Sequence, residues 1–217
     1  MLQAFKSLGF DVFEVTGRAR QRRRRFAELR RRMGSGWQPD FVYSEAATIP
    51  SSFTEPKHFP LVLNLERKFF KFLRTRGVPS GVFYRDVYWA FPDYRARVGA
   101  PVARAMTALY KREIETFNRY VDVLFLPSEQ MAEFIPGLQV ARVIALPPGA
   151  ELDPGPVAIA SDSLRIVYVG GVGGHHYDIS ALVAAVVETP GVDLTVCSPP
   201  DQLAAAVREY PGLQSRS

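Results

Sequence analysis

The residues best suited to binding phosphate lie late in the chain, where a glycine-rich stretch follows the predicted strand 165–169 and precedes the predicted helix 178–188. Glycines at such a turn permit positive φ angles and let a phosphate approach backbone N–H groups at a helix N-terminus. The stretch indicates a donor-phosphate site, and the alternative is an ordinary turn between a strand and a helix. The candidate residues are Gly170, Gly171, Gly173, Gly174 and His175.

The histidines of this stretch do not indicate a metal site. His175 and His176 are neighbours in the sequence, and adjacent side chains point in different directions on a helix or a strand. The third histidine of the chain, His58, is distant in the sequence. We therefore expect no metal, and one of the paired histidines can instead contact a diphosphate or a sugar hydroxyl.

A second group of polar residues follows strands predicted earlier in the chain. Arg85 and Asp86 come after the predicted strand 81–84, and Glu45 ends the strand 41–44. Ligands of open α/β sheets bind at the carboxyl ends of the strands, so these three residues are candidates for the active-site cleft. The competing interpretation is a buried Arg85–Asp86 pair that holds the aromatic loop after it. The sequence assigns no catalytic role among them, although Asp86 can act as a general base where it reaches an acceptor hydroxyl.

The elements that must position these residues alternate along the chain. Apolar runs of strand length are separated by segments with helical periodicity, which predicts an α/β fold with parallel sheets of Rossmann-like type. The predicted strands are 11–16, 41–44, 81–84, 121–126, 140–146, 165–169 and 193–197. The predicted helices are 1–8, 18–33, 61–76, 101–120, 128–134, 178–188 and one that begins at 201.

Proline and glycine divide the chain near its middle. Residues 151–163 are rich in these residues and read as a linker between a first domain, 1–150, and a unit that opens at 164. The last segment, 164–217, holds two strands and two helices, which is too little for a complete doubly wound domain.

The positive charge of the chain is concentrated in one segment. Of 217 residues with a net charge of +5, residues 1–34 carry a net +7 and the other 183 carry a net −2. The basic helix 18–33 therefore accounts for the high isoelectric point. Its outward residues are predicted to be Arg22, Arg23, Arg24, Arg25, Arg30 and Arg31.

Three interpretations of this helix stay open. It can be a solvated face without a partner, a surface that meets an anionic membrane, or a stripe that neutralises nucleic-acid phosphates. No nucleic-acid recognition motif accompanies the arginines, so nucleic acid is the least favoured partner.

The composition excludes several classes of protein. Hydrophobic residues make up 47% of the chain and charged residues 23%, which is typical of a globular protein and excludes a disordered or fibrous chain. A single cysteine, Cys197, excludes a disulfide-stapled module and is expected to be a small buried strand residue. We expect a cytoplasmic protein that can also lie on the inner face of the cell membrane.

The order of several short motifs resembles that of GT-B glycosyltransferases of the family 4 type. Residues 122–129 (DVLFLPSE) resemble the end of the family's first domain, and 146–151 (LPPGAE) resemble the segment that leads into its linker. Residues 164–171 (LRIVYVGG) are similar to the first strand and turn of its second domain. Residues 83–89 (FYRDVYW) are similar to a strand-end motif of capsular and exopolysaccharide glycosyltransferases.

The resemblance implies two Rossmann-like domains, of which the first binds the acceptor and the second binds the nucleotide sugar. It also implies a transfer reaction that retains the anomeric configuration of the sugar and needs no metal or cofactor. The donor would be a sugar nucleotide and the acceptor a polysaccharide or a lipid-linked saccharide. The family's opening strand and its donor-domain pair of glutamates have no counterpart here, and 170–178 holds no arginine or lysine. The resemblance therefore predicts a chain that is incomplete at both ends relative to the family.

The sequence thus favours a glycosyltransferase that moves a hexosyl group from a sugar nucleotide. The alternative is a non-catalytic Rossmann-like module that docks on an anionic membrane or on nucleic acid through its basic helix. Another enzyme of similar architecture, such as an epimerase, is the third interpretation.

Overall fold

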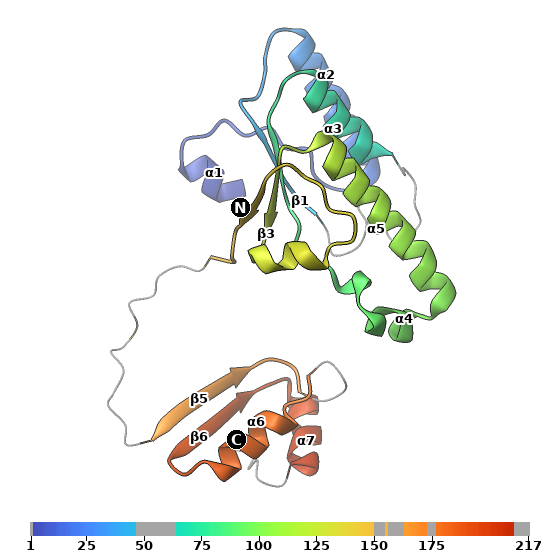
Figure 1. Cartoon of the computed structure of the whole chain (residues 1–217). Coiled ribbons are helices and arrows are strands. Elements are labelled where there is room, and N and C mark those ends of the chain that lie inside the picture. The colour runs from blue at the N-terminus through green and yellow to red at the C-terminus, as the bar shows by residue number, and fades with distance from the viewer. Residues whose placement is uncertain (1, 47–63, 150–154, 156–162, 173–176, 211–217) are drawn as a thin grey trace. The chain divides into compact units, whose positions relative to one another are not determined.

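The computed structural model describes residues 2–46, 64–149, 155, 163–172 and 177–210. The chain divides into two compact units, Met1–Ala150 and Glu151–Ser217 (Figure 1).

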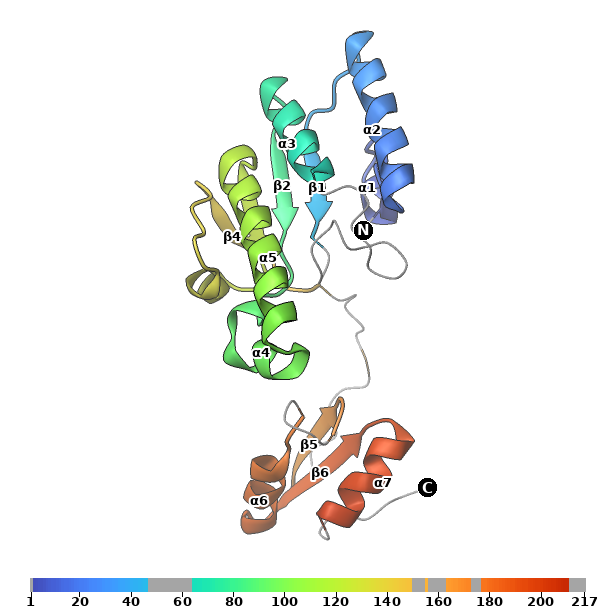
Figure 2. The ribbon, with the colours of Figure 1, turned by 90° about the vertical axis from the view of Figure 1, so that its right-hand side faces the viewer.

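The first unit is built on a four-stranded parallel sheet. Its strands are β1 (Val42–Glu45), β2 (Ser80–Phe83), β3 (Val123–Leu126) and β4 (Val143–Ala145), and they lie in the order β1-β2-β3-β4. Every pairing is parallel, so the carboxyl ends of the strands meet at one edge of the sheet (Figure 2). The predicted α/β fold with a parallel sheet is confirmed.

Three helices cover one face of this sheet. They are α2 (Ala19–Gly34), α3 (Leu65–Thr75) and α5 (Ala100–Tyr120), and α3 packs between the other two (Figure 2). The short helix α1 (Leu2–Ser7) lies on the other side of β1 (Figure 1). The short helices η3 (Tyr88–Ala90), α4 (Pro92–Val98) and η4 (Glu129–Phe134) complete the unit.

The core of the first unit lies between the sheet and these three helices. Phe26, Leu29 and Met33 recur at helical spacing on α2 and are all buried, as their periodicity predicts. In the sheet, Val82 and Leu124 face the helices and are almost fully buried, whereas their neighbours on the opposite face are only half-buried. The long helix α5 adds Tyr110, Ile114 and Phe117 to the same core.

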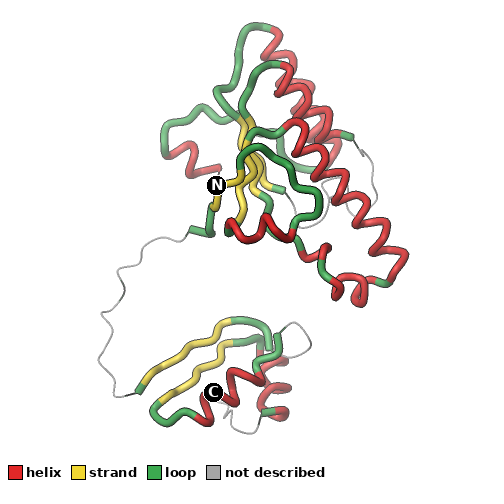
Figure 3. The backbone as a smooth tube through the Cα atoms, in the orientation of Figure 1, coloured by secondary structure: helices red, strands yellow, loops and turns green. Residues whose placement is uncertain are grey.

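The predicted strand at 11–16 is wrong. These residues run from α1 to α2 without joining the sheet, and no hydrogen bond from them to β1 is found in the described part of the chain (Figure 3). Two side chains of the apolar run that suggested a strand, Phe13 and Val15, instead pack against the edge of the core. Packing of side chains satisfies the same sequence pattern as strand pairing, which explains the error.

Two further predictions are corrected. The aromatic loop after β2 is not irregular, because it contains η3 and is followed by the separate helix α4 before α5 begins. Cys197 ends a strand as predicted, but it is exposed rather than buried.

The second unit has the predicted order of strand, helix, strand and helix. Strands β5 (Leu164–Val169) and β6 (Val192–Cys197) pair in parallel, and α6 (Ser180–Glu188) and α7 (Pro200–Glu209) pack on them. Its small core is formed by Val172, Ile179, Val183 and Ala206.

The packing of α3 yields a test of the first unit's core. Replacement of Leu73, which is 0% exposed, by alanine removes methylene groups between helix and sheet and is expected to lower the free energy of unfolding by about 2–5 kcal/mol. The matched change Leu146→Ala, at a residue that is 39% exposed, is expected to cost less than about 1 kcal/mol. Urea unfolding followed by tryptophan fluorescence measures both, because Trp37 and Trp89 lie in the first unit. Equal losses for the two variants would contradict this packing.

Candidate functional site

The structure brings two of the three predicted cleft residues together. Glu45 is the last residue of β1, and the parallel register pairs it with Phe83 at the end of β2. Arg85 lies two residues beyond the end of β2, and its guanidinium lies 3.9 Å from the Glu45 carboxylate. Both side chains are exposed, so the pair stands at the carboxyl edge of the sheet and is open to a ligand.

Asp86 lies beside this pair but differs from it in environment. Its side chain is half-buried, and this burial raises the pKa of the carboxyl above its ordinary value. The backbone N–H of Tyr88 and the charge of Arg85 act in the opposite direction on that pKa without reversing it. A carboxylate with a raised pKa at the exposed carboxyl edge of the sheet can accept a proton from a substrate. A hydroxyl group that acts as a nucleophile must lose its proton to such a group.

The loop after Asp86 is held by aromatic side chains rather than by an Arg85–Asp86 pair. Trp89 is buried, donates its Nε1–H to the Tyr84 hydroxyl at 2.7 Å and stacks on Tyr110 with ring centroids 5.0 Å apart. The hydroxyls of Tyr88 and Tyr110 lie 2.6 Å apart. Because Arg85 points outward to Glu45, the competing interpretation of a buried Arg85–Asp86 pair is wrong.

Sequence reasoning missed this tyrosine cluster as a supporting element. Burial raises the pKa of both Tyr84 and Tyr110 well above the ordinary value, so both phenols are neutral hydrogen-bonding groups. The density of aromatic residues between 84 and 94 was the available signal. The cluster fixes the start of the loop and therefore the position of Asp86.

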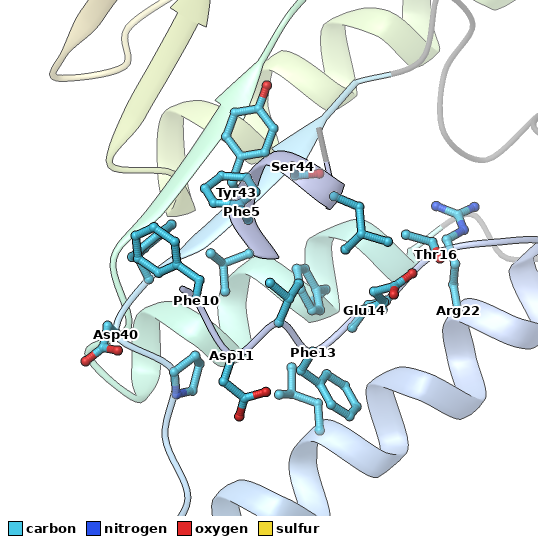
Figure 4. Close-up of a pocket in the computed structure, with 18 of the residues that line it drawn as sticks. Phe5, Phe10, Asp11, Phe13, Glu14, Thr16, Arg22, Asp40, Tyr43 and Ser44 are labelled. Carbon is cyan, nitrogen blue, oxygen red and sulfur yellow. The ribbon is translucent and has the colours of Figure 1, made fainter. Parts of the chain in front are cut away.

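A pocket of about 640 Å³ lies on the outer side of β1 (Figure 4). Residues 10–17 form one wall and 37–45 form the other, and Leu29 and Phe69 reach it from the helices. Tyr43 lies in this pocket near Phe5, and burial raises the pKa of Tyr43 to about 12, with a further contribution from the charge of Glu45. The pocket therefore shares Glu45 with the carboxyl-edge group.

The glycine-rich turn of the second unit is already partly occupied by protein contacts. The Gly170 N–H donates to Cys197 O at 3.0 Å, and the Val172 N–H donates to Gln202 Oε1 at 3.1 Å. Neither Gly170 nor Gly171 has a positive φ angle, so neither position requires glycine for its backbone conformation. Gly173, Gly174 and His175 lie outside the described residues.

The predicted basic face of α2 is present, with one correction. Arg22 points into the unit, where it is mostly buried and forms an ion pair with Glu66, so it does not belong to the outward face. Arg25 pairs with Glu28 and lies over the Phe13 ring, and Arg30 lies over the Phe72 ring. The remaining predicted residues, Arg23, Arg24 and Arg31, are exposed.

The described residues contain no cluster of three or more groups that could hold a metal ion. Among the helices in the described ranges, none combines the length and the apolar character needed to span a bilayer.

These features define an α/β protein whose first unit has a Rossmann-like parallel sheet with polar groups at its carboxyl edge. Comparison with known proteins adds no family to this description, because no protein-family model matches the chain and no curated protein is significantly similar to it.

The environment of Tyr43 predicts a specific pH dependence. A folded-state pKa near 12 lies above the ordinary value near 10, so the neutral phenol favours folding. This contribution is complete below about pH 10 and is lost as the pH rises from about 10 to 12. Tyr43→Phe should therefore make the decline in unfolding free energy between pH 10 and 12 shallower.

Tyr120 supplies a control of opposite sign. Burial alone would raise the pKa of Tyr120, but hydrogen bonds from Arg67 and Arg119 outweigh it and lower the pKa. Tyr120→Phe should therefore make the decline steeper than in the unmodified protein. Urea titrations at pH 9 to 12 measure both slopes, and an unchanged slope for Tyr43→Phe would contradict the proposed environment.

Proposed function

We propose that this chain belongs to a retaining glycosyltransferase of GT-B architecture, in which the first unit binds the acceptor. The reaction would transfer a hexosyl group from a sugar nucleotide to a polysaccharide or a lipid-linked saccharide, without a metal or cofactor. Two observations support the proposal: the resemblance of the motifs in their order along the chain, and the group formed by Glu45, Arg85 and Asp86 at the carboxyl edge of the sheet.

Each of these three residues has a chemical role in the proposal. Asp86, with its raised pKa, accepts a hydrogen bond from the acceptor hydroxyl and takes its proton. In the same step the bond from the anomeric carbon to the nucleoside diphosphate breaks, the diphosphate leaves, and the acceptor oxygen bonds to the same face of the sugar, so that the configuration is retained. Arg85 and Glu45 form an exposed ion pair, which offers a donor and an acceptor to the neighbouring sugar hydroxyls. Such positioning lowers the barrier because the reacting hydroxyl is held in the correct orientation.

An exposed aromatic pair extends the proposed acceptor surface. Phe91 and Phe134 are both exposed, and their ring centroids are 5.7 Å apart. Phe91 follows β2 and Phe134 follows β3, so both come from connections that leave the carboxyl edge. The flat apolar face of a sugar ring can pack on such a surface, where the burial of each exposed ring adds apolar contact.

The second unit is proposed to contribute the donor side. Because the N–H groups of Gly170 and Val172 are already hydrogen-bonded, the described part of its turn offers a phosphate little beyond the Gly171 N–H. We therefore expect this chain to bind a sugar nucleotide weakly, and a tight complex would contradict the expectation that its donor side lacks phosphate ligands.

A transfer assay tests the acceptor side. The chain is incubated with radiolabelled UDP-glucose, UDP-galactose or GDP-mannose and a polyprenyl-diphosphate-linked saccharide, and the labelled lipid is counted. Asp86→Asn is expected to reduce transfer by roughly 10²–10⁴-fold, because it removes the proton acceptor while keeping the side-chain shape. The matched change Glu115→Gln, at an exposed residue of α5, should leave transfer unchanged. Transfer that survives Asp86→Asn would contradict the role of this residue.

A second candidate function is docking on an anionic membrane, which the exposed arginines of α2 favour. The apolar residues Phe26, Leu29 and Met33 of this helix are buried in the core. The helix therefore cannot insert an apolar face into the bilayer while the unit is folded, and its attraction to lipid is electrostatic only. Such attraction amounts to about 1 kcal/mol for each arginine near an anionic surface and falls with salt.

Vesicle sedimentation measures this docking. Arg24→Gln combined with Arg31→Gln should weaken binding to phosphatidylglycerol vesicles by about five- to thirtyfold at low salt. Arg95→Gln combined with Arg104→Gln removes the same charge from exposed residues of α4 and α5 and should have a smaller effect. Equal effects of the two pairs would show that net charge alone drives binding, and stronger binding to duplex DNA than to vesicles would contradict a membrane role.

A further inference from the structure

The outer edge of β1 lacks a strand partner in the described part of the chain. Val42 N–H donates to Pro79 O at 2.8 Å and Ala46 N–H donates to Phe83 O at 2.9 Å, so the peptide groups of these residues face β2. Peptide groups alternate in direction along a strand, which turns those of Tyr43 and Glu45 toward the other side. That side is the pocket, which is therefore bordered by hydrogen-bonding groups suited to another strand.

The opposite wall of the pocket is also an extended segment. All eight residues from Phe10 to Gly17 line the pocket, as do all nine from Trp37 to Glu45. Neither segment donates a backbone hydrogen bond to the other within the described residues. The two segments meet through side chains at Phe10–Phe41 and Phe13–Trp37 but not through backbone hydrogen bonds. Their backbones therefore border the pocket, hereafter the slot, on two sides.

The remaining surfaces of the slot are apolar. Leu29 and Phe69 form its floor from the helical layer, and Leu2 and Phe5 of α1 cover it from the other side. Phe10 and Phe41, which also line the slot, are exposed large hydrophobic residues with ring centroids 5.6 Å apart. An occupant would be buried on both faces, which requires a continuous apolar run rather than an alternating one.

The charges of the slot give its occupant a direction. Asp11 and Asp40 lie at the end of the slot where β1 begins, while Glu14 and Arg22 lie toward the end where β1 finishes (Figure 4). Arg22 is already paired with Glu66. A strand parallel to β1 would place its N-terminal residues beside the two aspartates, where a positive charge is favoured.

We propose that this slot binds a separate apolar peptide strand, which inserts between β1 and residues 11–16, runs parallel to β1 and carries a basic residue at its N-terminal end. The inserted strand would pair with the Tyr43 and Glu45 peptide groups and convert 11–16 into the outer strand that its sequence predicts. This inference rests on the geometry of the sheet edge and is independent of the glycosyltransferase proposal.

Fluorescence polarisation with three labelled peptides tests the proposal. The first probe is Lys-Val-Ile-Val-Ile-Val-Ser, the second has Glu in place of Lys, and the third has Pro at the central Val. The first should bind saturably, the second about two- to fivefold more weakly as expected for loss of an exposed charge pair, and the third not at all. Binding of the proline peptide as tight as the first would overturn the proposal, since it would indicate unspecific apolar contact.

Two variants and one further readout sharpen the test. Asp11→Lys combined with Asp40→Lys should reverse the preference between the Lys and Glu peptides, and the control Asp93→Lys, at an exposed residue of α4, should not. Hydrogen exchange of the Tyr43 and Glu45 amides should slow by at least tenfold in the complex. Absence of saturable binding, an unchanged preference in the double variant, or unchanged exchange at both amides would each overturn the proposal.

Discussion

The arrangement of the first unit depends on the hydrogen bonds of Asp122 at the amino ends of β2 and β3. Its carboxylate accepts the Ser80 N–H at 2.8 Å and pairs with Arg74 of α3, while its own N–H donates to Ser80 O at 3.0 Å. These contacts fix the register in which Gly81 lies opposite Val123 and tie α3 to the sheet. With strands of only four residues, that register decides which side chains meet at the carboxyl edge.

The parallel sheet of the first unit determines both the candidate site at its carboxyl edge and the pocket beside β1. Parallel pairing brings Glu45 beside Arg85 at the carboxyl edge, where the neighbouring Asp86 is partly withdrawn from water. The aromatic cluster around Trp89 holds the loop that carries Asp86. Beyond β1 the sheet ends against a pocket instead of a strand, so that edge retains hydrogen-bonding capacity that the inner strands β2 and β3 use on both sides.

Much of the fold could be predicted from the sequence, because apolar residues mark the buried positions. They recur at helical spacing in α2, α3 and α5, and they form short continuous runs in β2 and β3. The segment 11–16 could not be assigned correctly, since a short apolar run has the same sequence whether its residues pair as a strand or only pack against the core. At the site, the strand-end rule identified Glu45, Arg85 and Asp86, but their pairing depends on register. The inward direction of Arg22 was hidden because its partner, Glu66, lies on another helix.

The central claim is that the carboxyl edge of this sheet binds a saccharide acceptor, and amide chemical-shift mapping tests it most directly. The isotopically labelled chain is titrated with hexasaccharides of glucose, galactose or mannose. We expect at least one of them to shift the amides of Ala46 and of residues 85–91, and we expect Asp86→Asn to reduce these shifts while Glu115→Gln does not. Shifts confined to other surfaces, or none with any of the three saccharides, would contradict it.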